Sequence, residues 1–175
     1  MSTPLFIDNI AFAKNNTLIS GNLSLSDCPR LFALVEEAYK SAGIEMSETQ
    51  LISFNLQGST DVASQHFLHL EIIANLHTIC QRCLGVMPLN LISNFNYLIS
   101  NVQDLQIGAG EIDGDDDIDL QQASSSMDII MLIEDELLMA MPIAPLHSEY
   151  CGKIISQSGE KPNPFAVLKR LKKTQ

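Results

Sequence analysis

The chain has 175 residues, of which 46% are hydrophobic and 18% are charged, and its formal net charge is −11. This length suits one domain with a sizeable core, and this composition excludes a chain that is disordered throughout. The excess of acid excludes nucleic-acid binding over most of the surface, because acidic side chains repel phosphate.

The first part of the chain predicts a strand followed by a helix. Alternating apolar residues over 16–25 predict the strand. Ser26 or Asp27 is suited to cap the helix, Pro29 to occupy its first turn and Gly43 to end it. Apolar residues three and four apart are expected to form its buried stripe: Leu31, Leu34, Val35 and Ala38.

The apolar period then changes to two, which predicts strands. A strand over 52–56 is followed by a turn and by a long strand over 68–76. The long strand has apolar residues on one face and polar residues on the other, which indicates an antiparallel sheet with one buried face. Another long strand begins after Gly85, so residues 80–85 are predicted to form the bend between the two.

Residues 103–126 lose this periodicity and are rich in Gly, Ser and acidic residues. They predict a mobile acidic loop with a short strand at 118–120. A second helix is predicted to begin with Ser125 or Ser126 as its cap and to end before Pro142. Its buried stripe is expected to consist of Ile130, Ile133, Leu137 and Met141.

These elements predict an α+β fold in a single domain. We expect an antiparallel sheet of about five strands with two helices covering one face. The domain is predicted to cover residues 1–160, including the acidic loop and an irregular segment from Pro145 onward. Residues 161–175 are predicted to be a basic tail, because they carry five of the ten basic residues and no acid.

The uneven charge indicates which partners the chain binds. Basic proteins suit the acidic domain, and RNA phosphate is expected to contact either the tail or a local basic patch that the sequence does not reveal. DNA is not an expected partner. The tail residues predicted to bind are Lys169, Arg170, Lys172 and Lys173.

The apolar stretches predict a cytoplasmic protein without a membrane partner. The first residues lack the basic start and apolar block of a secretory signal. Elsewhere, acidic residues interrupt every stretch before it reaches the roughly 20 apolar residues of a membrane span. Four cysteines in such a protein argue against a disulfide framework, because cytosolic thiols are kept reduced.

Cys80 and Cys83 form the strongest candidate motif for chemistry. Two thiolates two residues apart on a tight turn, with Gly85 close by, provide half of a tetrahedral zinc site. His147 and Cys151 have a spacing that suits the other half, if the fold brings the two pairs together. The alternative is a pair of buried thiols and a surface histidine.

Other chemistries fit these residues less well. A thioredoxin-like pair lies where a strand enters a helix, whereas here strand leads to strand. A zinc deaminase would have proline in place of Ile79 and a helix carrying its His-x-Glu, whereas His69 and Glu71 lie on a predicted strand. A calcium-binding EF-hand loop would need glycine in place of Ile118 and glutamate in place of Ser124.

Several motifs occur in a recognisable order along the chain. They are Cys80-Gln81-Arg82-Cys83-Leu84, the acidic stretch that ends in Asp117-Ile118-Asp119-Leu120, the run from Glu134 to Pro142 with Pro145, His147 and Cys151, and the segment from Lys161 to Leu168. In this order they resemble the YceD family, the large ribosomal RNA subunit accumulation proteins of bacteria and plastids. Some members of that family carry further cysteines near the position of His147, where this chain offers only His147 and Cys151.

The resemblance implies a role in ribosome biogenesis with no established enzyme activity. The expected function is therefore a non-catalytic factor that is required for large-subunit ribosomal RNA to accumulate and that binds a precursor particle or a basic ribosomal protein. One alternative is a small zinc-dependent enzyme, and another is an acidic interaction module for a basic partner unrelated to ribosomes. Four protein ligands would leave zinc no open position for water, so we expect any zinc here to be structural.

Overall fold

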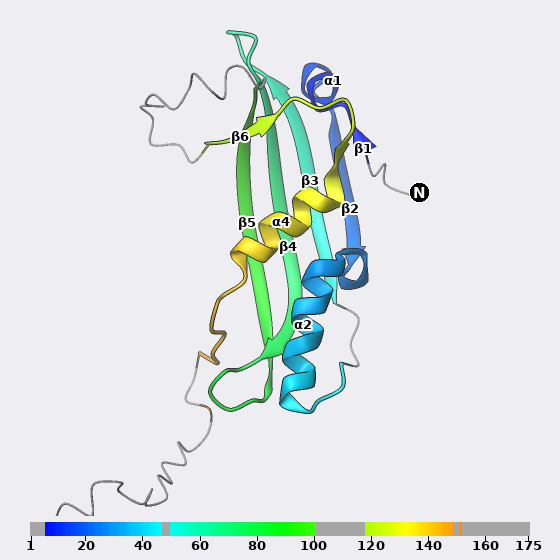
Figure 1. Cartoon of the computed structure of the whole chain (residues 1–175). Helices are drawn as coiled ribbons and strands as arrows, with labels where there is room; N and C mark the ends of the chain where they lie inside the picture. Colours follow the sequence, from blue (N-terminus) through cyan, green and yellow to red (C-terminus); the bar gives the residue numbers. More distant parts are fainter. Residues whose placement is uncertain (1–5, 47–49, 101–117, 149–150, 152–175) are drawn as a thin grey trace, which may run out of the picture.

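The computed structural model describes residues 6–46, 50–100, 118–148 and 151. In this part of the chain a five-stranded sheet carries three α-helices on one face, which is the predicted α+β fold with one more helix (Figure 1). In chain order the elements are β1 (Phe6–Ile7), α1 (Asn9–Lys14), β2 (Leu18–Ser24), the 3-10 turn η1 (Leu25–Asp27), α2 (Pro29–Ala42), β3 (Leu51–Thr60), β4 (His66–Ile79), β5 (Val86–Ser100), β6 (Ile118–Gln122), β7 (Met127–Asp128) and α4 (Ile129–Ala140).

The sheet has the order β2-β3-β4-β5-β6, and β1 pairs separately with β7. Neighbours from β2 to β5 are antiparallel, as predicted, but β6 lies parallel to β5. The prediction of a purely antiparallel sheet is therefore wrong at this edge. Residues 101–117 separate β5 from β6 in the sequence, and a connection of that length permits parallel pairing. The part of the predicted acidic loop over 103–117 lies outside the described residues.

One face of the sheet and the helices above it form the core. The alternate residues of β4 from Leu68 to Leu76 are buried, which confirms the predicted half-buried strand. Helix α4 buries Ile129, Ile133 and Leu137 against the same face. Helix α2 buries residues at a spacing of four, which are Leu31, Val35 and Tyr39. Leu34 lies outside this stripe and is 47% exposed, so the prediction that it is buried is wrong.

The start of α2 differs from the prediction. Ser26 and Asp27 do not cap it, because they belong to η1, whose cap is Ser24. The residue at the cap position of α2, Cys28, provides no side-chain hydrogen bond. Gly43 ends the helix as expected, with φ of 71°.

The missing cap of α2 comes from α4. Oε1 of Glu134 accepts hydrogen bonds from the backbone N–H groups of Arg30 at 2.5 Å and Leu31 at 3.1 Å. Oε2 of Glu134 accepts from Nε of Arg30 at 2.7 Å, and the carboxylate is almost fully buried. The first N–H groups of a helix have no acceptor within the helix, and here Glu134 provides one. The same hydrogen bonds join α4 to α2. Helix α4 is itself capped by Asp128, not by Ser125 or Ser126.

The other face of the sheet is not covered by any element that the structure describes. Ser and Asn are the commonest side chains on this face, which suits exposure to water, but the face also exposes the apolar side chains of Leu18, Leu51, Ile73 and Ile92. No helix among the described residues is long and apolar enough to cross a membrane.

Candidate metal centre

The bend between β4 and β5 lies at residues 80–85, as predicted. The backbone N–H of Cys80 donates to the carbonyl of Gly85 at 2.9 Å, and the N–H of Leu84 donates to the carbonyl of Cys80 at 2.9 Å. Leu84 adopts the left-handed conformation with φ of 57°, which costs a residue with a Cβ roughly 1–2 kcal/mol. This tight turn brings Cys83 back beside Cys80.

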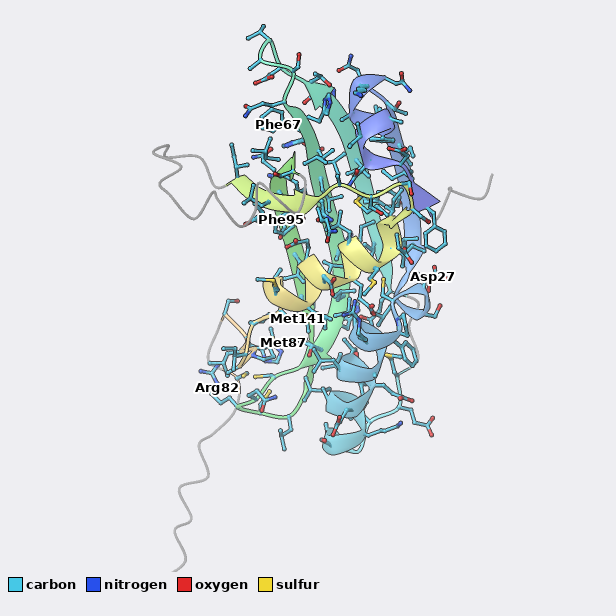
Figure 2. All side chains as sticks on the ribbon, turned by 45° about the horizontal axis from the view of Figure 1, so that its top comes forward. Asp27, Phe67, Arg82, Met87, Phe95 and Met141 are labelled. Carbon is cyan, nitrogen blue, oxygen red and sulfur yellow. The ribbon has the colours of Figure 1, made fainter. Side chains whose placement is uncertain are left out.

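The segment after α4 runs alongside this turn. Helix α4 ends at Ala140, and Pro142 prevents it from continuing. The N–H of Gln81 donates to the carbonyl of Pro145 at 2.9 Å, and Pro145 is buried. Figure 2 shows Arg82 at the end of the hairpin, beyond Met141 at the end of α4. This backbone bond places His147 next to the two cysteines of the turn.

The structure brings all four predicted ligands together. The sulfur or ring-nitrogen atoms that Cys80, Cys83, His147 and Cys151 offer lie within 4.8 Å of one another. Sγ of Cys80 is 3.5 Å from Sγ of Cys151, and Sγ of Cys83 is 3.5 Å from Nδ1 of His147. A tetrahedral zinc ion with ordinary bond lengths would separate two sulfurs by about 3.8 Å and a sulfur from a nitrogen by about 3.5 Å. The two 3.5 Å contacts therefore fit zinc closely, and separations of up to 4.8 Å within the cluster would shorten by up to about 1 Å when the ion binds.

The cluster favours negative charge on two of its sulfurs. Burial opposes ionisation of Cys80, but hydrogen bonds from the backbone of His147, Cys83 and Arg82 and from the thiol of Cys151 lower its pKa to about 5. Burial also opposes ionisation of Cys151, and the guanidinium of Arg82 then lowers the pKa of that thiol. The N–H of Gly85 favours the thiolate of Cys83, yet the neighbouring sulfurs raise its pKa.

The pKa of His147 is raised, whereas the pKa values of Cys80 and Cys151 are lowered. Hydrogen bonds to Cys80 and Cys151 raise its pKa, because negative sulfur favours the imidazolium. A metal cation takes the place of that proton when the imidazole becomes a ligand, so the same negative sulfurs that hold the proton would hold the cation.

Arg82 is a contributor that the spacing of the ligands did not predict. Its Nε and Nη2 atoms donate to Sγ of Cys151 at 3.3 and 3.2 Å, and Nη2 also donates to the carbonyl of His147 at 3.4 Å. A cation beside three sulfurs offsets part of their charge and holds the side chain of Cys151 in place. The available signal in the sequence was a basic residue between the two cysteines of the turn.

The donor set defines what the site can do chemically. Three sulfurs and one nitrogen from the protein satisfy the four positions that structural zinc sites use. A catalytic zinc site keeps one position for water or substrate, which this set of four does not leave. The predicted tail residues Lys169, Arg170, Lys172 and Lys173 lie outside the described residues, so their relation to the cluster stays a prediction.

Fold and cluster together define an α+β protein with a Cys/His cluster at the end of its longest hairpin. The family profile "Large ribosomal RNA subunit accumulation protein YceD" matches residues 68–172, which is more than half of the chain. The chain belongs to the YceD family, which confirms the resemblance. The matched segment contains most of β4, the whole of β5 and α4, and all four residues of the cluster.

A curated relative agrees with the family assignment over a shorter segment. The chain is 43% identical over 56 residues to the large ribosomal RNA subunit accumulation protein YceD of Haemophilus influenzae. The alignment covers 26% of this chain and 32% of the relative, so it spans about a third of that protein. No solved structure matches the chain.

Proposed function

We propose that this protein is a non-catalytic ribosome biogenesis factor that is required for large-subunit ribosomal RNA to accumulate. The observation that carries the proposal is the family match over residues 68–172. The protein acts in the cytoplasm, where it binds a large-subunit precursor particle or a basic ribosomal protein. Family membership favours this function over an acidic interaction module unrelated to ribosomes.

The metal in this proposal is a structural zinc ion held by Cys80, Cys83, His147 and Cys151. Zinc would fasten the segment after α4 to the β4–β5 hairpin, where one backbone bond, from Gln81 to Pro145, also holds it. Cys151 precedes the basic tail by ten residues. The proposed zinc thereby fixes Cys151, the ligand that lies ten residues before the tail.

Charge supports a division of work between the domain and its tail. Among the described residues only Lys14, Arg30, Lys40 and Arg82 are basic, and two of these are engaged in ion pairs with Asp or Glu. An acidic domain of this kind attracts a basic protein, and the tail over 161–175 provides the phosphate contacts.

Cells that lack this protein are expected to contain less large-subunit ribosomal RNA. Sucrose-gradient sedimentation of their ribosomes should show a smaller large-subunit peak, and a plasmid copy of the gene should restore it. A normal gradient together with normal ribosomal RNA levels would contradict the proposed function.

Removing residues 161–175 is expected to weaken binding to isolated large-subunit precursor particles and to flatten its dependence on salt. The tail carries five basic residues, so the logarithmic salt slope should fall by up to about five released counterions. Fluorescence anisotropy at several salt concentrations measures this slope. Lys14→Gln, which removes an exposed positive charge from α1, is the control and should change the slope little. An unchanged slope in the truncated chain would remove the tail from the proposal.

A further inference from the structure

The strand β2 forms one edge of the sheet. Within the described part of the chain it pairs only with β3, and it lies at the right-hand side of the sheet in Figure 1. Its seven residues, Leu18–Ser24, pair with β3 in one continuous register without a bulge. The outer side of this strand is thus a regular row of backbone groups.

The hydrogen-bond pattern shows which residues form that row. The N–H of Gly58 donates to the carbonyl of Thr17, and the N–H of Leu25 donates to the carbonyl of Gln50. In an antiparallel pair every second residue bonds to the neighbouring strand, so the odd-numbered residues of β2 bond to β3. The residues whose N–H and C=O groups point away from the sheet are Leu18, Ser20, Asn22 and Ser24.

This edge lacks the features that usually prevent strands from pairing. Exposed edges are ordinarily protected by charged side chains, by proline, by a bulge or by a very short strand. Residues 15–26 contain no charged residue and no proline, although the whole chain has 31 charged residues, counting its 21 acidic and 10 basic ones. Among the described residues β2 is therefore open to a further strand over Leu18–Asn22, whereas at its end the carboxylate of Asp27 accepts the N–H of Ser24 at 2.7 Å.

The residues of β2 are arranged symmetrically about Gly21. On each side of this glycine follow a polar and then an apolar residue: Ser20 and Ile19 before it, Asn22 and Leu23 after it. An antiparallel pair of two such strands centred on Gly21 places Ile19 opposite Leu23 of the second copy. Both residues lie on the covered face, where Leu23 is buried and Ile19 packs against the core.

We propose that two copies of this protein associate through β2, antiparallel and centred on Gly21, to form one continuous sheet of ten strands. In this register Leu18 pairs with Ser24 of the second copy and Ser20 with Asn22 of the second copy. The outward groups of Ser20 and Asn22 then satisfy each other, and the N–H of Leu18 donates to the C=O of Ser24. The N–H of Ser24 itself already donates to the carboxylate of Asp27 at 2.7 Å. Gly21 faces its own copy at the symmetry axis, where the two backbones approach most closely and no side chain intervenes.

The symmetry favours a second copy over an unrelated extended peptide as the occupant. A two-fold interface requires that one surface complement itself, and the five central residues of β2, which have the same polar and apolar order in both directions from Gly21, do so. An unrelated peptide would need no such symmetry in β2. The proposal is independent of the ribosomal function, since it depends on the edge strand alone.

Analytical ultracentrifugation of the full chain tests this association. We expect the wild-type protein to sediment as a dimer, and Ser20→Pro to weaken dimerisation by at least about tenfold, because proline removes an outward N–H and not a bond to β3. Ser20→Ala is the matched control, since it keeps the N–H, and it should dimerise like the wild type. Sedimentation of the wild type as a monomer at every concentration up to about 100 µM would overturn the proposal.

A second pair of variants applies if Ser20→Pro does not fold, as judged by circular dichroism. Asn22→Lys places a charge on each strand of the proposed pair, whereas Asn94→Lys places the same charge on β5 of the same exposed face. Only Asn22→Lys should weaken the dimer, again by at least about tenfold. Equal dimerisation of these two variants, or of the Ser20 variants, would show that β2 is not the interface.

Discussion

Replacing Glu134 with Ala is expected to lower the free energy of unfolding by about 2–4 kcal/mol. The buried carboxylate accepts two backbone N–H groups at the start of α2 and binds the side chain of Arg30. Alanine would leave both donors without an acceptor at a helix start that has no other side-chain cap. Urea unfolding followed by circular dichroism measures the change.

The neighbouring acid provides the control for this prediction. Asp135 pairs with Nη1 of Arg30 at 2.7 Å, but its side chain is 47% exposed and caps nothing in the described structure. Asp135→Asn should therefore cost less than about 1 kcal/mol. Equal losses of stability from Glu134→Ala and Asp135→Asn would show that the ion pair matters and the cap does not.

The same carboxylate predicts part of the response to acid. Burial opposes ionisation of Glu134, but the N–H of Leu31 and the groups of Arg30 outweigh it and lower the pKa of this carboxyl in the folded chain. A carboxyl with a lower pKa when folded stabilises the protein above its unfolded pKa of about 4.3 and loses that contribution as the pH falls through the folded pKa. The stability difference between wild type and Glu134→Gln should consequently shrink below about pH 4.3.

The cap shows why local sequence could not predict the whole fold. Ser26 and Asp27 had the right chemistry to cap α2, and Pro29 marked its first turn correctly. The actual cap comes from a residue 104 positions later, which only the packing of α4 on α2 brings there. In the sequence Glu134 looked like a polar interruption of an apolar stretch.

The strands of the sheet could be predicted where the alternation of apolar and polar residues determines them, but the pairing at the β6 edge could not. The two long strands and the bend between them follow from a period of two with polar residues on one face. The parallel pairing of β6 with β5 joins residues that are far apart in the sequence, and no local pattern indicates its direction. The exposure of Leu34 was not predicted either. Two neighbouring stripes of α2 contain apolar residues, and only packing decides which of them is buried.

The metal cluster could be predicted from the sequence in part. The spacing of Cys80 and Cys83 on a tight turn indicated one half of the site, and His147 with Cys151 indicated the other. Their meeting required that the chain after α4 run beside the hairpin, which the bond from Gln81 to Pro145 secures. The role of Arg82 in the cluster could not be predicted, because it depends on the contact between its guanidinium and Cys151, which only the fold shows.

Changing Cys83 to Ser is expected to abolish the near-stoichiometric zinc that we predict in the purified protein. A serine hydroxyl is a poor zinc ligand compared with a thiolate, and three remaining ligands hold the ion more weakly. Elemental analysis after gel filtration gives the zinc content, and hydrogen exchange of the Gln81 amide reports whether the segment after α4 stays attached. Cys28→Ala is the matched control, because Cys28 lies buried in the core outside the cluster and burial raises its pKa to about 12. Wild-type protein without zinc, or a Cys83→Ser variant that keeps it, would contradict the proposed metal centre.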